Sequence, residues 1–211
     1  MSKPAEAKTT ETEINYRKGQ YVSTKTYTHS LGLSACFRQH KAESHCRFLH
    51  GYSLQVKVLF YAEELDVRNW VVDFGSLKSF KGWLEDTFDH KCLVAEDDPH
   101  LSTFRDLERL GMIQLRVVPA TGCEAFARMV YEYLEGWLKD NGYSPRCGIS
   151  WVEVREHEAN SALYIPESSS INVNLKMKVA YDEASEVARV VQGSKEKEKD
   201  KGESASEFGS R

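Results

Sequence analysis

A chain of 211 residues with 41% hydrophobic side chains can bury one substantial core, and its length argues against two full domains. The formal net charge of −4 argues against a protein that coats nucleic acid. The chain has no apolar run near the roughly 20 residues that cross a bilayer, and MSKPAEAKTTETE at its start lacks the apolar stretch of a signal peptide. We therefore expect a cytoplasmic protein that binds neither nucleic acid nor membranes.

The two ends of the chain differ from its middle in composition. Residues 1–14 are polar, and residues 183–211 contain a run of alternating charges with almost nothing to bury. Such segments cannot gain enough apolar burial to offset the entropy of ordering. The sequence therefore predicts one folded domain over residues 15–182, between two disordered tails.

Strands dominate the first half of this domain. Residues 21–37, rich in small and hydroxyl side chains, predict one long strand, and residues 50–64 predict a second. In the second strand apolar residues recur at every other position, in register with His50 and Tyr52, so these two side chains lie at the entry end of the core-facing surface. Residues 69–74 predict a third, short strand.

Helices enter after the third strand. Apolar residues at helical spacing predict a helix over 75–89, a shorter one over 97–111, and the strongest over 122–142. Strands are predicted at 112–119, 148–158 and 171–181. The order β-β-β-α-α-β-α-β-β predicts an α+β fold in which helices cover one face of an antiparallel sheet.

A few residues could carry chemistry. Cys46 lies beside His45 and four residues before His50, and thiols close to imidazoles bind zinc or act as thiolates. Asp89 and His90 form an adjacent acid and base, and Glu156 ends a strand. Taken singly, each of these residues has a simpler explanation than catalysis, namely packing or exposure to solvent.

Five sequence motifs that follow one another in a fixed order are a more specific signal than any of these residues alone. They are CRFLHG before a strand, VVDFGSLK and FDH around a helix, GCEAFA at the start of the next long helix, and VREHE on a late strand. Over residues 27–164 this order resembles the 6-pyruvoyl-tetrahydropterin synthase family, whose bacterial branch includes 6-carboxytetrahydropterin synthase of queuosine and 7-deazaguanine synthesis. The resemblance implies a T-fold, an antiparallel sheet with two long helices on one face. It also implies oligomerisation into a barrel, usually a homohexamer, with active sites between subunits.

The resemblance also implies roles for individual residues. Cys46 matches the general base that moves a proton on the substrate side chain, and Asp89 with His90 matches the proton relay that assists it. Glu156 matches the carboxylate that anchors the pterin, since two acceptor oxygens suit the ring N–H and amino group of a 2-amino-4-oxo heterocycle. The segment that also contacts the pterin, at a helix N-terminus, matches Gly122, Cys123 and Glu124.

The metal site departs from the family pattern. The family holds zinc with three histidines, but here Phe37 and Tyr52 occupy two of the three positions and only His50 is retained. One imidazole cannot hold zinc, which needs three or four protein ligands. A rebuilt zinc site could combine His50 with other donors nearby, namely His40, His45 and Cys36.

Phe37 and Tyr52 at these two positions are also compatible with an active site that holds no metal. In such a site the Tyr52 hydroxyl could donate a hydrogen bond to the substrate's side-chain oxygen in place of a Lewis acid. Alternatively, Phe37 and Tyr52 fill the vacated space by ring packing, and the chemistry has been lost.

Two functions follow from these observations. The first is a carbon–oxygen lyase of the tetrahydropterin synthase type, which eliminates triphosphate from 7,8-dihydroneopterin triphosphate in pterin or queuosine biosynthesis. The retention of Cys46, Asp89, His90 and Glu156 favours it. The second is a T-fold protein that binds a pterin or purine through Glu156 without turnover, which the loss of two ligand histidines favours.

Overall fold

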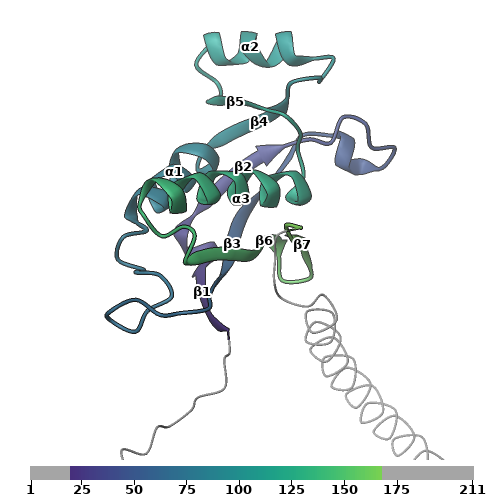
Figure 1. Ribbon diagram of the computed structural model, residues 1–211. Helices are drawn as coiled ribbons and strands as arrows, with labels where there is room; N and C mark the ends of the chain where they lie inside the picture. The colour runs from purple at the N-terminus through teal and green to yellow at the C-terminus, as the bar shows by residue number, and fades with distance from the viewer. Residues whose placement is uncertain (1–19, 168–211) are drawn as a thin grey trace, which may run out of the picture. The chain divides into compact units, whose positions relative to one another are not determined.

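The computed structural model describes residues 20–167 (Figure 1). The predicted tails, 1–14 and 183–211, and the predicted strand 171–181 lie outside the described residues. Within the described part, no helix combines the length and the apolar character needed to cross a bilayer.

The α+β prediction is confirmed by one sheet built around the long strand β3 (His50–Ala62). Strand β1 (Tyr21–Tyr27) pairs antiparallel with the second half of β3, and β2 (Leu33–Phe37) with its first half. The prediction of one strand over 21–37 was wrong, because a 3-10 turn η1 (His29–Leu31) and Gly32 at a φ of 79° separate β1 from β2. A glycine adopts this left-handed conformation without steric cost.

The remaining strands complete the order β5-β4-β2-β3-β6-β7. Their bounds are β4 (Lys91–Ala95), β5 (Leu115–Val118), β6 (Cys147–His157) and β7 (Asn160–Tyr164). Strand β6 is antiparallel to β3, as predicted, and β7 is antiparallel to β6, but β4 is parallel to both β2 and β5. The sheet is therefore mixed, and sequence patterning missed β4 and β7.

Helices cover both faces of the sheet. The two longer helices, α1 (Lys78–Phe88) and α3 (Cys123–Asp140), lie side by side on one face, as predicted, and α2 (Leu101–Arg109) lies beside β4 and β5 (Figure 1). Along β4, Leu93 packs into the main core, whereas Cys92 and Val94 pack into a second cluster with α2. Because side chains alternate across a strand, α2 lies on the opposite face from α1 and α3.

The main core is filled by aromatic side chains. Phe37 of β2, Phe88 of α1 and Phe126 of α3 are fully buried. The ring of Phe126 meets those of Phe37 and Phe88 edge to face, with centroids 5.1 and 5.5 Å apart. Such pairs add about 0.5–1.5 kcal/mol to the free energy of burial, so this contact fixes the end of β2 against α3.

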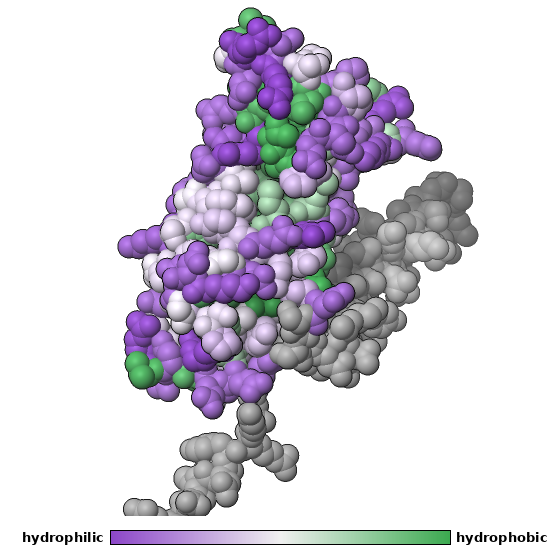
Figure 2. Space-filling view, turned by 45° about the horizontal axis from the view of Figure 1, so that its top comes forward, coloured by the Kyte–Doolittle hydropathy of each residue, from purple (hydrophilic) through white to green (hydrophobic). Residues whose placement is uncertain are grey.

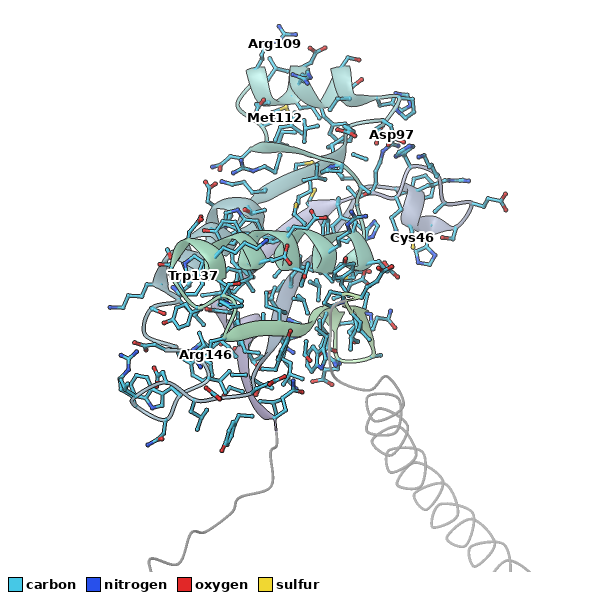
Figure 3. All side chains as sticks on the ribbon, in the orientation of Figure 1. Cys46, Asp97, Arg109, Met112, Trp137 and Arg146 are labelled. Carbon is cyan, nitrogen blue, oxygen red and sulfur yellow. The ribbon has the colours of Figure 1, made fainter. Side chains whose placement is uncertain are left out.

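Most of the surface in Figure 2 is hydrophilic, with hydrophobic areas between the polar side chains, some of them towards the top of the view. Leu110 and Met112, just after α2, are 72% and 68% exposed. Figure 3 places Met112 beside the end of this helix.

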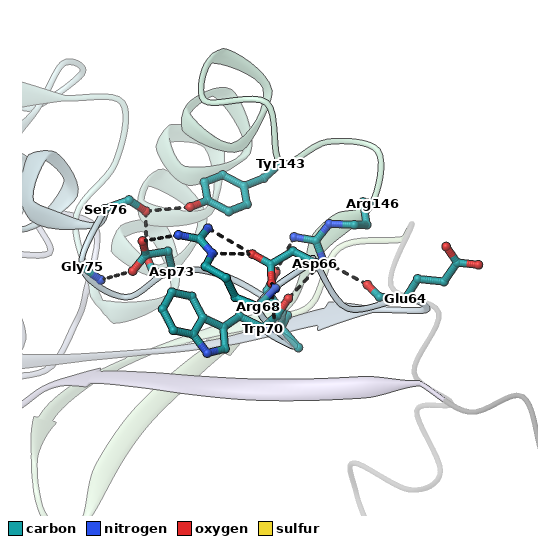
Figure 4. A network of polar contacts seen from close by, with 10 residues as sticks. Glu64, Asp66, Arg68, Trp70, Asp73, Gly75, Ser76, Tyr143 and Arg146 are labelled. Atoms are coloured by element: carbon teal, nitrogen blue, oxygen red, sulfur yellow. Dashed lines mark hydrogen bonds and ion pairs between the residues drawn. The ribbon is translucent and has the colours of Figure 1, made fainter. Parts of the chain in front are cut away.

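Residues 69–74 form a turn rather than the predicted strand (Figure 4). The carboxylate of Asp66 accepts hydrogen bonds from the backbone N–H groups of Arg68 and Trp70, at 2.8 and 2.9 Å. The guanidinium of Arg146 donates to the carbonyl oxygen of Trp70 at 3.3 Å. Side chains thus satisfy backbone groups that a strand would pair with a neighbour.

Candidate active site

Cys46 lies in the loop that connects β2 to β3, on the 3-10 turn η2 (His45–Arg47) (Figure 3). The carbonyl oxygen of Cys46 accepts a hydrogen bond from the backbone N–H of Gln39 at 2.9 Å, and the Ser44 hydroxyl accepts from the N–H of Cys46 at 3.4 Å. The thiol is half-buried. The loop therefore holds Cys46 in place and leaves it accessible to a small molecule.

Tyr52 lies at the centre of the candidate site. Its ring is 5.6 Å from that of His50 and 5.9 Å from that of His157, between centroids. Burial raises the pKa of the Tyr52 phenol, and negative charge on Glu156 and Cys46 raises it further. Tyr52 therefore keeps its proton at neutral pH and can donate a hydrogen bond.

A β-bulge lies at Glu156. Arg155 pairs with Ser161 and His157 pairs with Asn160, so Glu156 is an extra residue on β6. Bulges re-aim side chains and are frequent beside active sites.

Cys123, the first residue of α3, lies in the electrostatic range of Glu156. Burial raises the pKa of the Cys123 thiol well above its ordinary value, and the negative charges of Glu156 and Glu124 raise it further. Cys123 is therefore a neutral thiol rather than a nucleophile.

The N-terminus of α3 closes the site. Gly122 precedes the helix at a φ of 113°, and a Cβ on it would lie 2.7 Å from Nε2 of Gln39. The backbone conformation favours a glycine here, whereas the end of the flexible Gln39 side chain could move away from a Cβ. The first N–H groups of a helix lack intrahelical acceptors and carry partial positive charge, so they suit a ring carbonyl or a phosphate. Glu124 lies in the first turn and is exposed.

An ion pair between Arg38 and Asp98 holds the start of the loop between β2 and β3, which carries Cys46. The Arg38 guanidinium donates to both carboxylate oxygens of Asp98, at 2.8 and 2.6 Å. The Asp98 side chain is 1% exposed, and the bond from Arg38 lowers the pKa of this carboxyl. The carbonyl oxygen of Arg38 accepts from the Thr121 hydroxyl at 2.6 Å, next to α3.

We expect Asp98→Asn to lower the free energy of unfolding by about 3 kcal/mol, because it leaves a buried guanidinium without its counter-ion. Since the folded state lowers the Asp98 pKa, this contribution is present above the ordinary carboxyl range and is lost as the pH falls through the lowered value. Urea unfolding at pH 7 and at acidic pH measures both effects. The neighbouring Asp97→Asn is the matched control, because Asp97 is half-exposed and pairs with the exposed Lys41. An equal loss in both variants would contradict the anchoring role.

Asp89 and His90 form a pair away from these residues. Oδ1 of Asp89 lies 2.7 Å from Nδ1 of His90 and accepts a hydrogen bond from the N–H of Ser34 at 3.3 Å. The His90 side chain is 79% exposed. Within residues 20–167, no recorded interaction joins this pair to Cys46 or Glu156.

The residues present do not fit the family's zinc site. The ring of Phe37 is fully buried and lies 5.0 Å from that of His50, between centroids, so it fills a position that a ligand would need. Nδ1 of His50 lies 2.7 Å from the carbonyl oxygen of Phe48, which leaves Nε2 as its one available nitrogen. A single imidazole nitrogen is too few donors for zinc.

The rebuilt zinc site does not form within one chain either. Cys36 faces the α2 side of the sheet with its sulfur 3.7 Å from that of Cys92. His40 lies 3.7–3.8 Å from the carboxylates of Asp97 and Asp98, and His45 is exposed on η2. Among the residues that the structure describes, no three His, Cys, Asp or Glu side chains lie close enough to hold a metal. The four predicted ligands are thus dispersed.

Two residues of the site were missed by sequence reasoning. His157 follows Glu156, and strict alternation would send the two side chains to opposite faces of β6. The bulge at Glu156 allows His157 to approach Tyr52. Gln39 gave no sequence signal, because its contact with Gly122 joins segments more than 80 residues apart.

Comparison with known proteins agrees with this architecture. Residues 26–167 match the family model of 6-pyruvoyl tetrahydropterin synthase. A 6-carboxy-5,6,7,8-tetrahydropterin synthase of Aquifex aeolicus is 27% identical over 159 residues, which cover 73% of this chain and 95% of the relative. A protein of the same name from Rickettsia bellii is 32% identical over 60 residues, 28% of this chain and 44% of the relative.

Solved structures share the fold. An uncharacterised protein of Wolinella succinogenes superposes with a TM-score of 0.58 at 24% identity, covering 70% of this chain and 99% of that one. The 6-pyruvoyl tetrahydropterin synthase of Plasmodium falciparum superposes with a TM-score of 0.51 at 15% identity, covering 69% and 96%. Since the family model matches well over half of the sequence, the chain belongs to the 6-pyruvoyl tetrahydropterin synthase family of lyases.

Proposed function

We propose that this chain eliminates triphosphate from 7,8-dihydroneopterin triphosphate at a site formed by Cys46, Tyr52 and Glu156. The observation that supports the proposal is the raised pKa of the Tyr52 phenol on β3, which is due to burial and to negative charge on Glu156, at the bulge of β6, and on Cys46, in the loop after β2. The ring of Tyr52 also lies 5.9 Å from that of His157, between centroids. A fold kept for its stability alone has no need of an acid, a thiol and a carboxylate at one place.

Pterin binding is assigned to Glu156 and the start of α3. Two carboxylate oxygens accept hydrogen bonds from the ring N–H and the 2-amino group, which is a bidentate match. The N–H groups that follow Gly122 face a ring carbonyl without intrahelical competitors.

Proton transfer is assigned to Cys46. Its thiolate accepts a proton from C2′ of the substrate side chain, and the electrons of that C–H bond form a double bond as the C3′–O bond to triphosphate breaks. Tyr52, whose raised pKa keeps it protonated, donates a hydrogen bond to the side-chain oxygen and orients the side chain for loss of the C2′ proton. A phenol is a weaker electrophile than a metal, so we expect turnover to be slow.

The Asp89–His90 pair is assigned to a second copy of the chain. The His90 side chain is 79% exposed and its Nδ1 contacts Asp89, so Nε2 is available to a neighbouring subunit. An assembly such as the homohexamer that the sequence resemblance implies would place His90 of one copy near Cys46 of the next.

The test is an assay of the full chain on 7,8-dihydroneopterin triphosphate with detection of released triphosphate. The pterin product identified in the same assay assigns the reaction to the 6-carboxy or the 6-pyruvoyl branch. The names of the two curated relatives support 6-carboxytetrahydropterin, and hence queuosine biosynthesis.

A second candidate function is pterin or purine binding without turnover. The burial of Phe37 against His50 favours it, because the family's metal ligands are not replaced by other donors among the described residues of one chain. Binding of 7,8-dihydroneopterin triphosphate without triphosphate release would support this candidate against the lyase.

A further inference from the structure

Two cysteines outside the proposed active site lie side by side on the opposite face of the sheet. Cys36 in β2 pairs directly with Cys92 in β4, and their sulfur atoms are 3.7 Å apart. Paired residues of neighbouring strands project from the same face, which here is the face that α2 covers. On that face Cys92 packs with Val94 and Phe104.

The two thiols have different surroundings. Cys92 is 3% exposed, whereas Cys36 is half-buried and can be reached by a small solute. The hydrogen bond between them lowers the pKa of Cys36 to about 7, because a thiol that donates to a thiolate stabilises its charge. The same bond and burial raise the pKa of Cys92 above its ordinary value. A nucleophilic thiolate thus lies against a protonated thiol.

We propose that Cys36 and Cys92 are a redox modification site, which hydrogen peroxide converts into a reversible disulfide. The Cys36 thiolate attacks one peroxide oxygen, the O–O bond breaks, and a sulfenic acid forms on Cys36 with release of water after protonation. The sulfur of Cys92 then attacks the sulfur of Cys36 and loses its proton, and a second water leaves. Two thiols supply two electrons, and one peroxide accepts them.

The backbone geometry suits this bond. Neighbouring strands lie about 4.8 Å apart, which is within the range of about 4.4–6.8 Å between the Cα atoms of a disulfide. The sulfur atoms must move from 3.7 Å to about 2.05 Å apart. Rotation about the two Cα–Cβ bonds can achieve this change while the strands stay paired.

The bond would link the strand that leads into the Cys46 loop to the strand that follows His90. Cys36 precedes Phe37, whose ring is 5.0 Å from that of His50, and β2 leads into the loop that carries Cys46. Cys92 follows His90 by two residues. The modification itself does not depend on the proposed function, since it needs the two thiols and peroxide alone.

Peptide mapping tests the proposal on the full-length chain. The protein is treated with hydrogen peroxide, denatured, alkylated and digested with trypsin. Cys36 and Cys92 fall in separate tryptic peptides, 26–38 and 92–105, and Cys46 falls in a third, 42–47. We expect peptides 26–38 and 92–105 to be recovered joined by a disulfide bond, and dithiothreitol to separate them. Their recovery as two singly alkylated peptides, under conditions that oxidise Cys46, would overturn the proposal.

Two variants control for other pairings. Cys46→Ser should form the 26–38/92–105 link in unchanged yield, whereas Cys36→Ser should leave Cys92 fully alkylated after denaturation. If Cys36→Ser does not fold, the pH dependence of alkylation in the native wild-type chain tests the reactivity of Cys36 instead. The alkylation rate of Cys36 should then rise with a midpoint near pH 7, and a midpoint at the ordinary thiol value of about 8.5 would contradict the reactive thiolate.

Discussion

Glu156→Gln is expected to weaken the binding of 7,8-dihydroneopterin triphosphate by at least about 100-fold while the protein stays folded. The carboxylate offers two acceptors to two ring donors, and each charge-assisted hydrogen bond contributes about 1.5–3 kcal/mol. Glutamine keeps the volume but presents an NH₂ group to a ring N–H or amino group, so a donor faces a donor.

Isothermal titration of the wild-type chain and the variant measures this loss. Glu158→Gln is the matched control, because Glu158 is an exposed residue two positions further along the chain, after the end of β6. The control should bind as tightly as the wild type, and both variants should show unchanged circular dichroism. Unchanged affinity in Glu156→Gln would refute the anchoring role.

Cys46→Ala is expected to bind the substrate normally and to lose turnover by about 10²–10⁴-fold, the usual contribution of a positioned general base. The change removes the sulfur and leaves the binding groups Glu156 and Cys123 in place. Single-turnover measurement of triphosphate release, beside a binding titration, separates the two effects. His45→Ala changes a neighbouring exposed side chain on η2 and should have the activity of the wild type. An active Cys46→Ala variant would eliminate Cys46 as the base.

A mixing experiment extends this prediction to the Asp89–His90 pair. If each site combines Cys46 of one copy with His90 of another, equal amounts of Cys46→Ala and His90→Ala chains should restore about a quarter of the sites after random reassembly. Each variant alone should be inactive. Inactivity of the mixture, with both chains assembled, would place Cys46 and His90 in the same chain's site. Activity of the His90→Ala chain alone would remove His90 from the mechanism.

The elements that could be predicted from sequence are those with a long, uninterrupted hydrophobic period. The alternation that runs from His50 to Phe60 identified β3, and the spacing of apolar residues identified α1 and α3. Strand β4 was missed because it is five residues long and four of them are buried on both faces of the sheet, so it has no alternation to detect.

Part of the candidate site could be predicted from the order of motifs along the chain. Motif order indicated Cys46, Cys123 and Glu156; burial raises the pKa of Tyr52, and an electrostatic interaction with each of these three residues raises it further. The proposed zinc ligands were chosen by chemical type and by nearness in the sequence. Cys36 projects from the opposite face of β2 to Phe37, and His40 pairs with acidic residues of a distant turn, which no local pattern reveals.

The most direct test of the proposed chemistry combines turnover with metal content on one preparation of the full chain, purified without added zinc or chelator. We expect release of triphosphate from 7,8-dihydroneopterin triphosphate without stoichiometric metal, and loss of that activity in Tyr52→Phe. Tight binding of the substrate with no triphosphate release would contradict the lyase and leave a pterin-binding T-fold protein. Stoichiometric zinc with turnover that a chelator abolishes would contradict the role given to Tyr52.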